Sequence, residues 1–119
     1  MLDEKTAKLI LFSAVDPVDI FWQGEVLRNG AVNTYQNIIN SSSYLKISDF
    51  PLIRNIVLKA NVENLKSEII AANAQFISSE DFDWPVSCQD LSAPPIGLVI
   101  KGERDLLTKL NNSISIVGS

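Results

Sequence analysis

The spacing of apolar residues changes once along this chain of 119 residues, close to Asn73. Before that point, apolar side chains recur every three or four residues, which is the period of amphipathic helices. After it they come in short β-branched runs, such as residues 75–77 and 98–100, separated by loop-like stretches. A helical half followed by strand, loop and strand predicts an α+β chain.

The first half carries start and stop signals for helices. Asp16 before Pro17 is a typical N-cap followed by proline at the first helical position, and Asn29-Gly30 is a typical stop. In the segment between them, Ile20, Phe21, Gly24 and Leu27 fall on one face. The sequence predicts five helices, at about residues 3–14, 17–29, 32–40, 50–60 and 62–73.

The second half predicts a sheet. Strands are expected at about residues 75–77, 98–100 and 114–117, with a short helix at 103–110 and a loop over 78–95. The predicted boundary lies at 73–75. It divides the chain into a helical domain, residues 1–73, and the start of a second, truncated domain, residues 74–119.

Composition excludes several classes of activity. The chain contains no histidine, which removes Ser-His-Asp and Cys-His nucleophile systems and the commonest metal ligand. Cys88 is the single cysteine, so no internal disulfide and no thiolate zinc site are expected. We therefore predict no enzyme, no metal site and no cofactor. Without a signal peptide or an apolar run of membrane-spanning length, a cytoplasmic location is expected.

The last six residues, Ile-Ser-Ile-Val-Gly-Ser, form an apolar run that ends in glycine. An apolar strand that breaks at Gly-Ser is how many phosphate-binding α/β domains begin their first strand-to-helix turn. The pattern predicts a phosphate site that begins at Gly118 and Ser119, and a chain that stops where the site starts.

Several motifs in the second half together carry a family resemblance. They are Asp83-Trp84-Pro85, Asp90-Leu91, Pro95–Gly102, Asp105-Leu106 and Ser115–Ser119, and Leu11–Asp19 adds an earlier match. In this order and spacing the chain resembles the DprA/Smf family of bacterial DNA-processing proteins, in particular its actinobacterial-type members. The resemblance covers almost the whole chain, and residues 82–119 carry most of its specificity.

The resemblance implies a function in DNA uptake. Proteins of that family bind single-stranded DNA, help to load the RecA recombinase during natural transformation, and are not known for catalysis. It implies a sterile-alpha-motif-like or helix-hairpin-helix-like module followed by a Rossmann-like sheet. The family's DNA pocket begins at a Gly-Ser-Arg turn, which corresponds here to Gly118 and Ser119. The arginine would come next, so the 119 residues alone are expected to bind DNA weakly.

The chain also departs from the family pattern. A helix-hairpin-helix module usually has a Gly-x-Gly hairpin that contacts phosphate, whereas residues 14–19 contain no glycine and two acids. Phosphate binding is not expected there.

Several other residues invite a functional interpretation. Trp22 and Trp84 are candidates for base stacking, but packing in a helix and in a turn is favoured for them. The acids Glu80, Asp81, Asp83 and Asp90 fit no calcium loop and are expected to be solvated. Lys101, Arg104 and Lys109 are candidates for facing DNA, with solvated helix charges favoured, and Cys88 is expected to be an unreactive thiol.

Two alternatives stay open. One is a free-standing helical module that binds a protein partner and has no DNA role; the other is a Rossmann-type nucleotide enzyme, which would need more glycines. Because an interior strand at 114–117 would lack neighbours, we also expect residues 111–119 to fray or to pair with another chain, giving a homo-oligomer.

Overall fold

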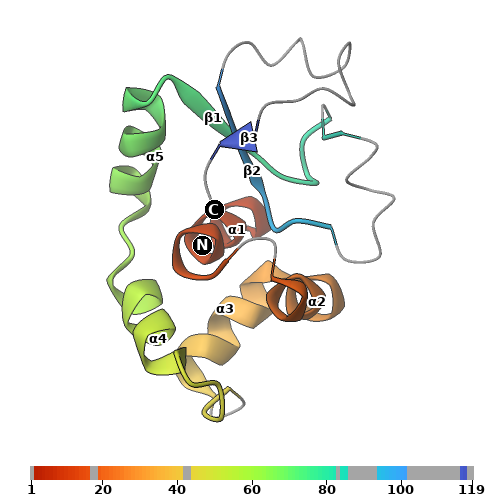
Figure 1. Ribbon diagram of the computed structural model, residues 1–119, viewed down its shortest axis with the longest axis vertical. Coiled ribbons are helices and arrows are strands. Elements are labelled where there is room, and N and C mark those ends of the chain that lie inside the picture. The colour runs from red at the N-terminus through yellow and green to blue at the C-terminus, as the bar shows by residue number, and fades with distance from the viewer. Residues whose placement is uncertain are drawn as a thin grey trace.

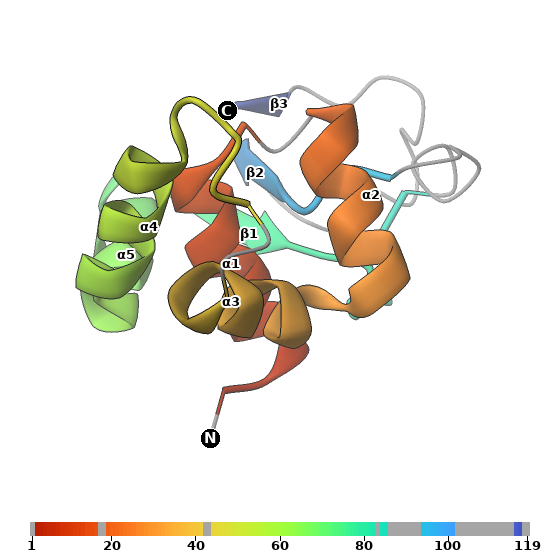
Figure 2. The same ribbon diagram turned by 90° about the horizontal axis from the view of Figure 1, so that it is seen from below.

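The computed structural model describes residues 2–16, 19–41, 44–82, 84–85, 94–101 and, for the backbone only, 116–117. The helices are α1 (Glu4–Ala14), α2 (Ile20–Asn29), α3 (Ala31–Asn40), α4 (Phe50–Lys59) and α5 (Val62–Ala71); the strands are β1 (Ala74–Ile77), β2 (Leu98–Lys101) and β3 (Ile116–Val117). Helix α1 lies in the centre, with α2 and α3 on one side, α4 and α5 on another, and the strands beyond it (Figures 1 and 2). None of the described helices is long and apolar enough to cross a membrane.

Four of the five helices begin within a residue or so of their predicted start. Asp3 and Asn61 cap α1 and α5 by accepting hydrogen bonds from the backbone N–H groups of Thr6 and Asn64. The prediction for α2 was wrong: the helix begins at Ile20, and Asp19 rather than Asp16 is its N-cap. The Asp19 carboxylate accepts the Phe21 N–H at 2.9 Å, which satisfies a donor that the first helical turn leaves free.

A sharp turn joins α2 to α3 at Gly30, as the Asn29-Gly30 signal predicts. Gly30 has a φ of 83°, a conformation that favours glycine, and it leaves α3 without a capping side chain. Glu4 of α1 fills that role from 27 residues away, because its carboxylate accepts the N–H groups of Ala31 and Val32 at 2.8 and 3.1 Å. A β-carbon at position 30 would lie 3.2 Å from that carboxylate, so the small residue also makes room for the cap.

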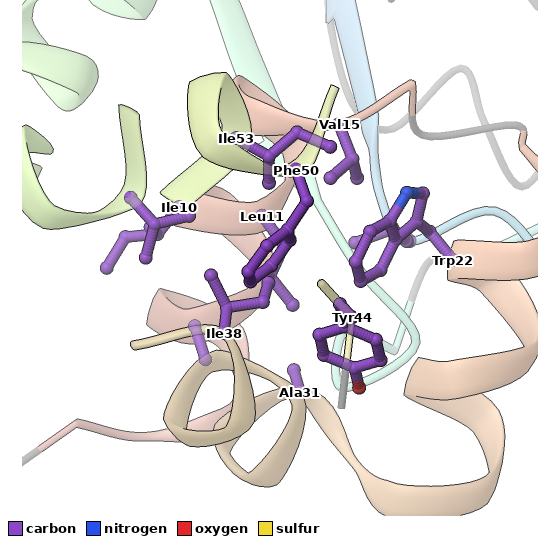
Figure 3. Close-up of a cluster of buried hydrophobic side chains, with 12 residues drawn as sticks. Ile10, Leu11, Val15, Trp22, Ala31, Ile38, Tyr44, Phe50 and Ile53 are labelled. Atoms are coloured by element: carbon purple, nitrogen blue, oxygen red, sulfur yellow. The ribbon is translucent and has the colours of Figure 1, made fainter. Parts of the chain in front are cut away.

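The main core is apolar and lies between the helices. Phe50 is fully buried, and Figure 3 shows its ring beside Leu11, Ile38 and Tyr44. The 12 buried residues of this cluster are Ala7, Ile10, Leu11, Val15, Trp22, Ala31, Ile38, Tyr44, Phe50, Ile53, Val57 and Ile96. Ile96 comes from the strand half, so the two predicted domains share this core.

The apolar face predicted for α2 does not point into the core. Ile20 and Leu27 are 79% and 59% exposed, whereas Trp22 and Gln23 are buried. The ring of Trp22 packs edge-on against Tyr44 with ring centroids 5.0 Å apart. This contact rotates α2 about its axis so that the face with Trp22, and not the face with Ile20 and Leu27, points into the core.

The described strands form one antiparallel sheet in the order β1-β2-β3. Phe76 of β1 pairs with Val99 of β2, and Val99 pairs on its other side with Val117 of β3. The protein is thus an α+β fold, and the described residues show no parallel, Rossmann-like sheet. The expectation that the last strand lacks partners is wrong for Ile116 and Val117, which pair with β2 of the same chain.

Candidate functional site

Most of the residues that the sequence predicts for DNA binding lie outside the described part of the chain. They are Gly118, Ser119, Arg104 and Lys109, and the same holds for Cys88, Asp83, Asp90 and the predicted helix at 103–110. Lys101 is described and lies exposed at the end of β2. The predicted phosphate site therefore stays a prediction.

The most polar junction of the described residues joins α1 to the turn after β1. Lys8 donates hydrogen bonds to the Glu80 carboxylate at 2.8 Å and to the Ser79 hydroxyl at 2.8 Å. One helical turn earlier, Lys5 pairs with Asp81 at 2.9 Å. These four charged residues, which we call the α1 clamp, tie together segments more than 70 residues apart in the sequence.

The clamp has a defined charge state at neutral pH. Burial alone would raise the pKa of Glu80, but hydrogen bonds from Lys8 and Ser78 outweigh it and hold the pKa below its usual value. The turn is closed further by Asp81, whose carboxylate accepts the Ser78 N–H at 2.9 Å. Glu80 is therefore a stable anion beside a largely buried ammonium group.

The solvated acidic loop predicted from the sequence is confirmed for Glu80, whose side chain is 39% exposed, whereas that of Asp81 is only 16% exposed; both carboxylates are also paired with lysines. Among the residues that the structure describes, no group of three or more acidic or cysteine side chains is placed to hold a metal ion. Paired and already satisfied, the two carboxylates orient the turn and are not poised to transfer protons.

The two tryptophans pack as predicted. Trp22 is 4% exposed and belongs to the helical core, and Trp84 packs against Ile77, Leu98 and Ile100 on the sheet. The indole N–H of Trp84 is buried without a hydrogen-bond partner in the described part of the molecule. The ring of Trp22 is therefore not available for base stacking, and that of Trp84 is partly buried against the sheet.

A buried hydrogen bond supports the aromatic group around Trp22. The Tyr44 hydroxyl donates to the Glu25 carboxylate at 2.7 Å. Burial, followed by this contact with Glu25, raises the pKa of Tyr44 to about 12, so the phenol stays neutral at physiological pH. Arg28 pairs with the same carboxylate, which leaves Glu25 with a structural role.

A cavity of about 420 Å³ lies between α1, α5 and β1. Its lining is mainly apolar, with Leu9, Ile69 and Phe76 as the larger side chains and Lys5 and Lys66 near it. It has room for a small ligand, and its mainly apolar lining suits the binding of an apolar group.

Sequence reasoning missed the residues of α1 that bind other parts of the chain: Glu4, Lys5 and Lys8. Each looks like an ordinary surface charge in the first turns of a helix. Two features of the sequence are related to them: α3 begins after a glycine and so has no N-cap side chain of its own, and two adjacent acids follow β1. Neither feature identifies which residue of α1 makes the contact.

Comparison with known proteins gives no match: no family model, curated protein or solved structure is significantly similar to this chain.

Proposed function

We propose that these 119 residues belong to a DprA/Smf-like protein that binds single-stranded DNA and helps to load RecA. Within it, the described helices and strands support the DNA site and carry out no chemistry. The chain has no histidine, and the carboxylates of Glu80 and Asp81 next to the strands form ion pairs with lysines. Both observations support a non-catalytic role.

The observation that carries the proposal is the pairing of β2 with β3. Two of the motifs that carry the family resemblance, Pro95–Gly102 and Ser115–Ser119, supply these strands, and Val99 lies opposite Val117. Gly118 and Ser119 are the next residues along the chain. A glycine directly after a strand lets a phosphate approach the backbone closely, as phosphate-binding turns require.

We further propose that β1, β2 and β3 form the margin of a larger Rossmann-like sheet. Their antiparallel pairing is compatible with this, since doubly wound sheets often carry antiparallel strands at an edge. The α1 clamp would then hold the helical module against that margin.

Fluorescence anisotropy with labelled oligo-dT tests the DNA role. The 119-residue chain, with its net charge of −4, is expected to bind weakly and to lose binding between low and physiological salt. In a longer chain that continues past Ser119, submicromolar binding is expected, and Gly118→Asp is expected to weaken it by about tenfold or more. The matched control is Asn64→Asp, which adds the same charge at an exposed position of α5.

Submicromolar binding by the 119 residues alone at physiological salt would contradict the expectation of weak binding. A longer chain that binds no DNA, or that responds equally to the substitutions at Gly118 and Asn64, would contradict the DNA role itself.

A second candidate is a protein-interaction module without a DNA role. Large apolar side chains on α2 and α4 favour it, since Leu27, Leu52 and Leu58 are each about 60% exposed. A longer chain that binds no oligo-dT but retains a protein partner would favour this candidate.

A further inference from the structure

The outer face of α4 holds an apolar groove of about 280 Å³. Pro51, Arg54, Asn55 and Leu58 lie along it at helical spacing, and Leu45 closes it from the preceding turn. Leu45 and Leu58 are each 60% exposed, and Leu52 beside them is 62% exposed. We call this surface, made by residues 45–59, the α4 groove.

The charge around the α4 groove is opposite to that of the chain. Residues 45–59 contain Lys46, Arg54 and Lys59 against the single acid Asp49, whereas the whole chain has 14 acidic and 10 basic side chains. Lys46 and Lys59 are exposed, and neither has an ion-pair partner among the described residues. Each directly follows a lining residue in the sequence, Leu45 or Leu58, and Arg54 is itself part of the lining. Positive charge next to an apolar floor is complementary to an acidic partner with apolar side chains.

Arg54 gives the groove a fixed positive charge. Its guanidinium donates to the backbone carbonyls of Ile38 and Ser41, each at 2.7 Å, and lies 4.9 Å from the centre of the Phe50 ring. These contacts hold the side chain in place without neutralising it, because carbonyl groups carry no net charge. A carboxylate that reaches the groove would therefore meet a positioned cation, and little side-chain entropy would be lost.

From this arrangement we propose that the α4 groove binds an acidic amphipathic helix of a partner protein. Leucine-type side chains of that helix fill the apolar floor, and its flanking carboxylates face Lys46, Arg54 and Lys59. The inference goes beyond the proposed DNA role and does not depend on it.

The same features argue against a nucleic acid or an anionic lipid surface as the partner. Residues 44–60 are all described, and they expose no aromatic ring on which a base would stack, since Phe50 is fully buried and Tyr44 is 4% exposed. Two backbone carbonyls hold Arg54 in one position, which suits one positioned carboxylate better than laterally mobile lipid headgroups.

The test uses two synthetic peptides of about 15 residues, or roughly four helical turns. Both place leucines at positions i, i+4 and i+7; one carries glutamates on the flanks and the other carries lysines there. With the isotopically labelled 119-residue chain, amide shifts in NMR spectra map the contact, and anisotropy of the labelled peptide gives the Kd. The acidic peptide is expected to bind and to shift amides of residues 45–59.

Matched variants distinguish binding at the α4 groove from non-specific hydrophobic binding. Leu58→Ser is expected to weaken binding by about tenfold, because it removes much of the apolar contact. Leu27→Ser, which replaces an equally exposed leucine on α2, is expected to leave the Kd unchanged. Lys46→Glu and Lys59→Glu are each expected to weaken binding by about two- to fivefold at low salt, and Lys66→Glu on α5 serves as their control.

All these positions are exposed, so the variants are expected to keep the fold, which circular dichroism verifies. The inference is overturned if the acidic peptide does not bind, or if the lysine peptide binds equally well. It is also overturned if oligo-dT, phosphatidylglycerol vesicles or a second copy of the chain occupies residues 45–59 more tightly than the acidic peptide. Loss of oligo-dT binding by a longer chain would leave this inference standing and would count only against the DNA role.

Discussion

Two clusters of buried residues differ in size and in what surrounds them. The cluster around Phe50 contains 12 buried residues, which come from helices α1 to α4, from the connecting residues Val15 and Tyr44, and from Ile96; further apolar side chains pack around it. The cluster on the sheet contains Ile77, Leu98 and Ile100, with Trp84 packed against it. The first is an ordinary helical core, whereas the second is too small to stabilise a sheet by apolar burial alone.

The smaller cluster is reinforced by contacts with α1. Phe76 packs edge-on against Phe12 with ring centroids 5.4 Å apart, and the α1 clamp adds two ion pairs across the same junction. The strands therefore depend on the helices more than the helices depend on the strands. Damage to the large core is expected to unfold the whole molecule, while damage at the junction is expected to act first on β1 and β2.

The largest effect is expected from Phe50→Ala. Removing a fully buried ring from the centre of the core should lower the free energy of unfolding by about 3–5 kcal/mol. Urea unfolding followed by circular dichroism measures it, and Leu52→Ala on the exposed side of the same helix is expected to stay within about 0.5 kcal/mol. Equal effects at the two positions would mean that α4 does not pack as described.

A smaller and more local effect is expected from Gly97→Ala. A β-carbon there would lie 2.4 Å from the Phe76 ring, so the ring or the strand must move, at a cost of about 1–3 kcal/mol. Hydrogen exchange should show the loss mainly in the amides of β1 and β2, with α3 and α4 less affected.

Gly24→Ala provides the matched control for Gly97→Ala. Its new β-carbon meets only the flexible end of Arg28, at 3.1 Å, and alanine favours the helix by up to about 1 kcal/mol. Uniform loss of protection in all elements of Gly97→Ala would contradict the separation of the two clusters.

The parts of the fold that the sequence predicted are those with local signals. The Asn29-Gly30 stop and the apolar runs of β1 and β2 each act within a few residues. The start of α2 was missed because Asp16 and Asp19 both suit an N-cap, and the packing of Trp22 lies outside any local pattern. The antiparallel direction of the strands depends on the path of the connecting chain, which composition does not encode.

The candidate site was less predictable than the fold for the same reason. Glu4, Lys5 and Lys8 acquire their roles from partners 27 to 76 residues away. Arg54, likewise, is positioned by the carbonyl groups at the end of α3, so its fixed charge beside an apolar groove emerges only from the packing of α3 on α4.

Glu4→Ala tests how far the helical half depends on one polar contact. The change removes the only side chain seen to cap the N–H groups of Ala31 and Val32 in the described part of the chain, and should cost about 1 kcal/mol. Glu63→Ala, in the exposed first turn of α5, should have little effect in the same urea titration. Identical results for the two variants would show that water replaces the cap without loss.

The smallest effect concerns pH and the clamp. Because the pKa of Glu80 is lower in the folded chain than its usual value of 4.5, its contribution to stability is present above that value. It is lost as the pH falls through the folded pKa. Glu80 is 39% exposed, so solvent screening should keep the contribution below about 1 kcal/mol.

Glu80→Gln should therefore be less stable than the unsubstituted chain at neutral pH, and the difference should shrink as the pH falls below about 4.5. Urea titrations at several pH values measure it, with the exposed Glu68→Gln as the control for a general carboxylate effect. A difference that stays constant with pH would mean that the Glu80 side chain acts through packing or neutral hydrogen bonds. The ion pair with Lys8 would then contribute nothing to holding the strands against α1.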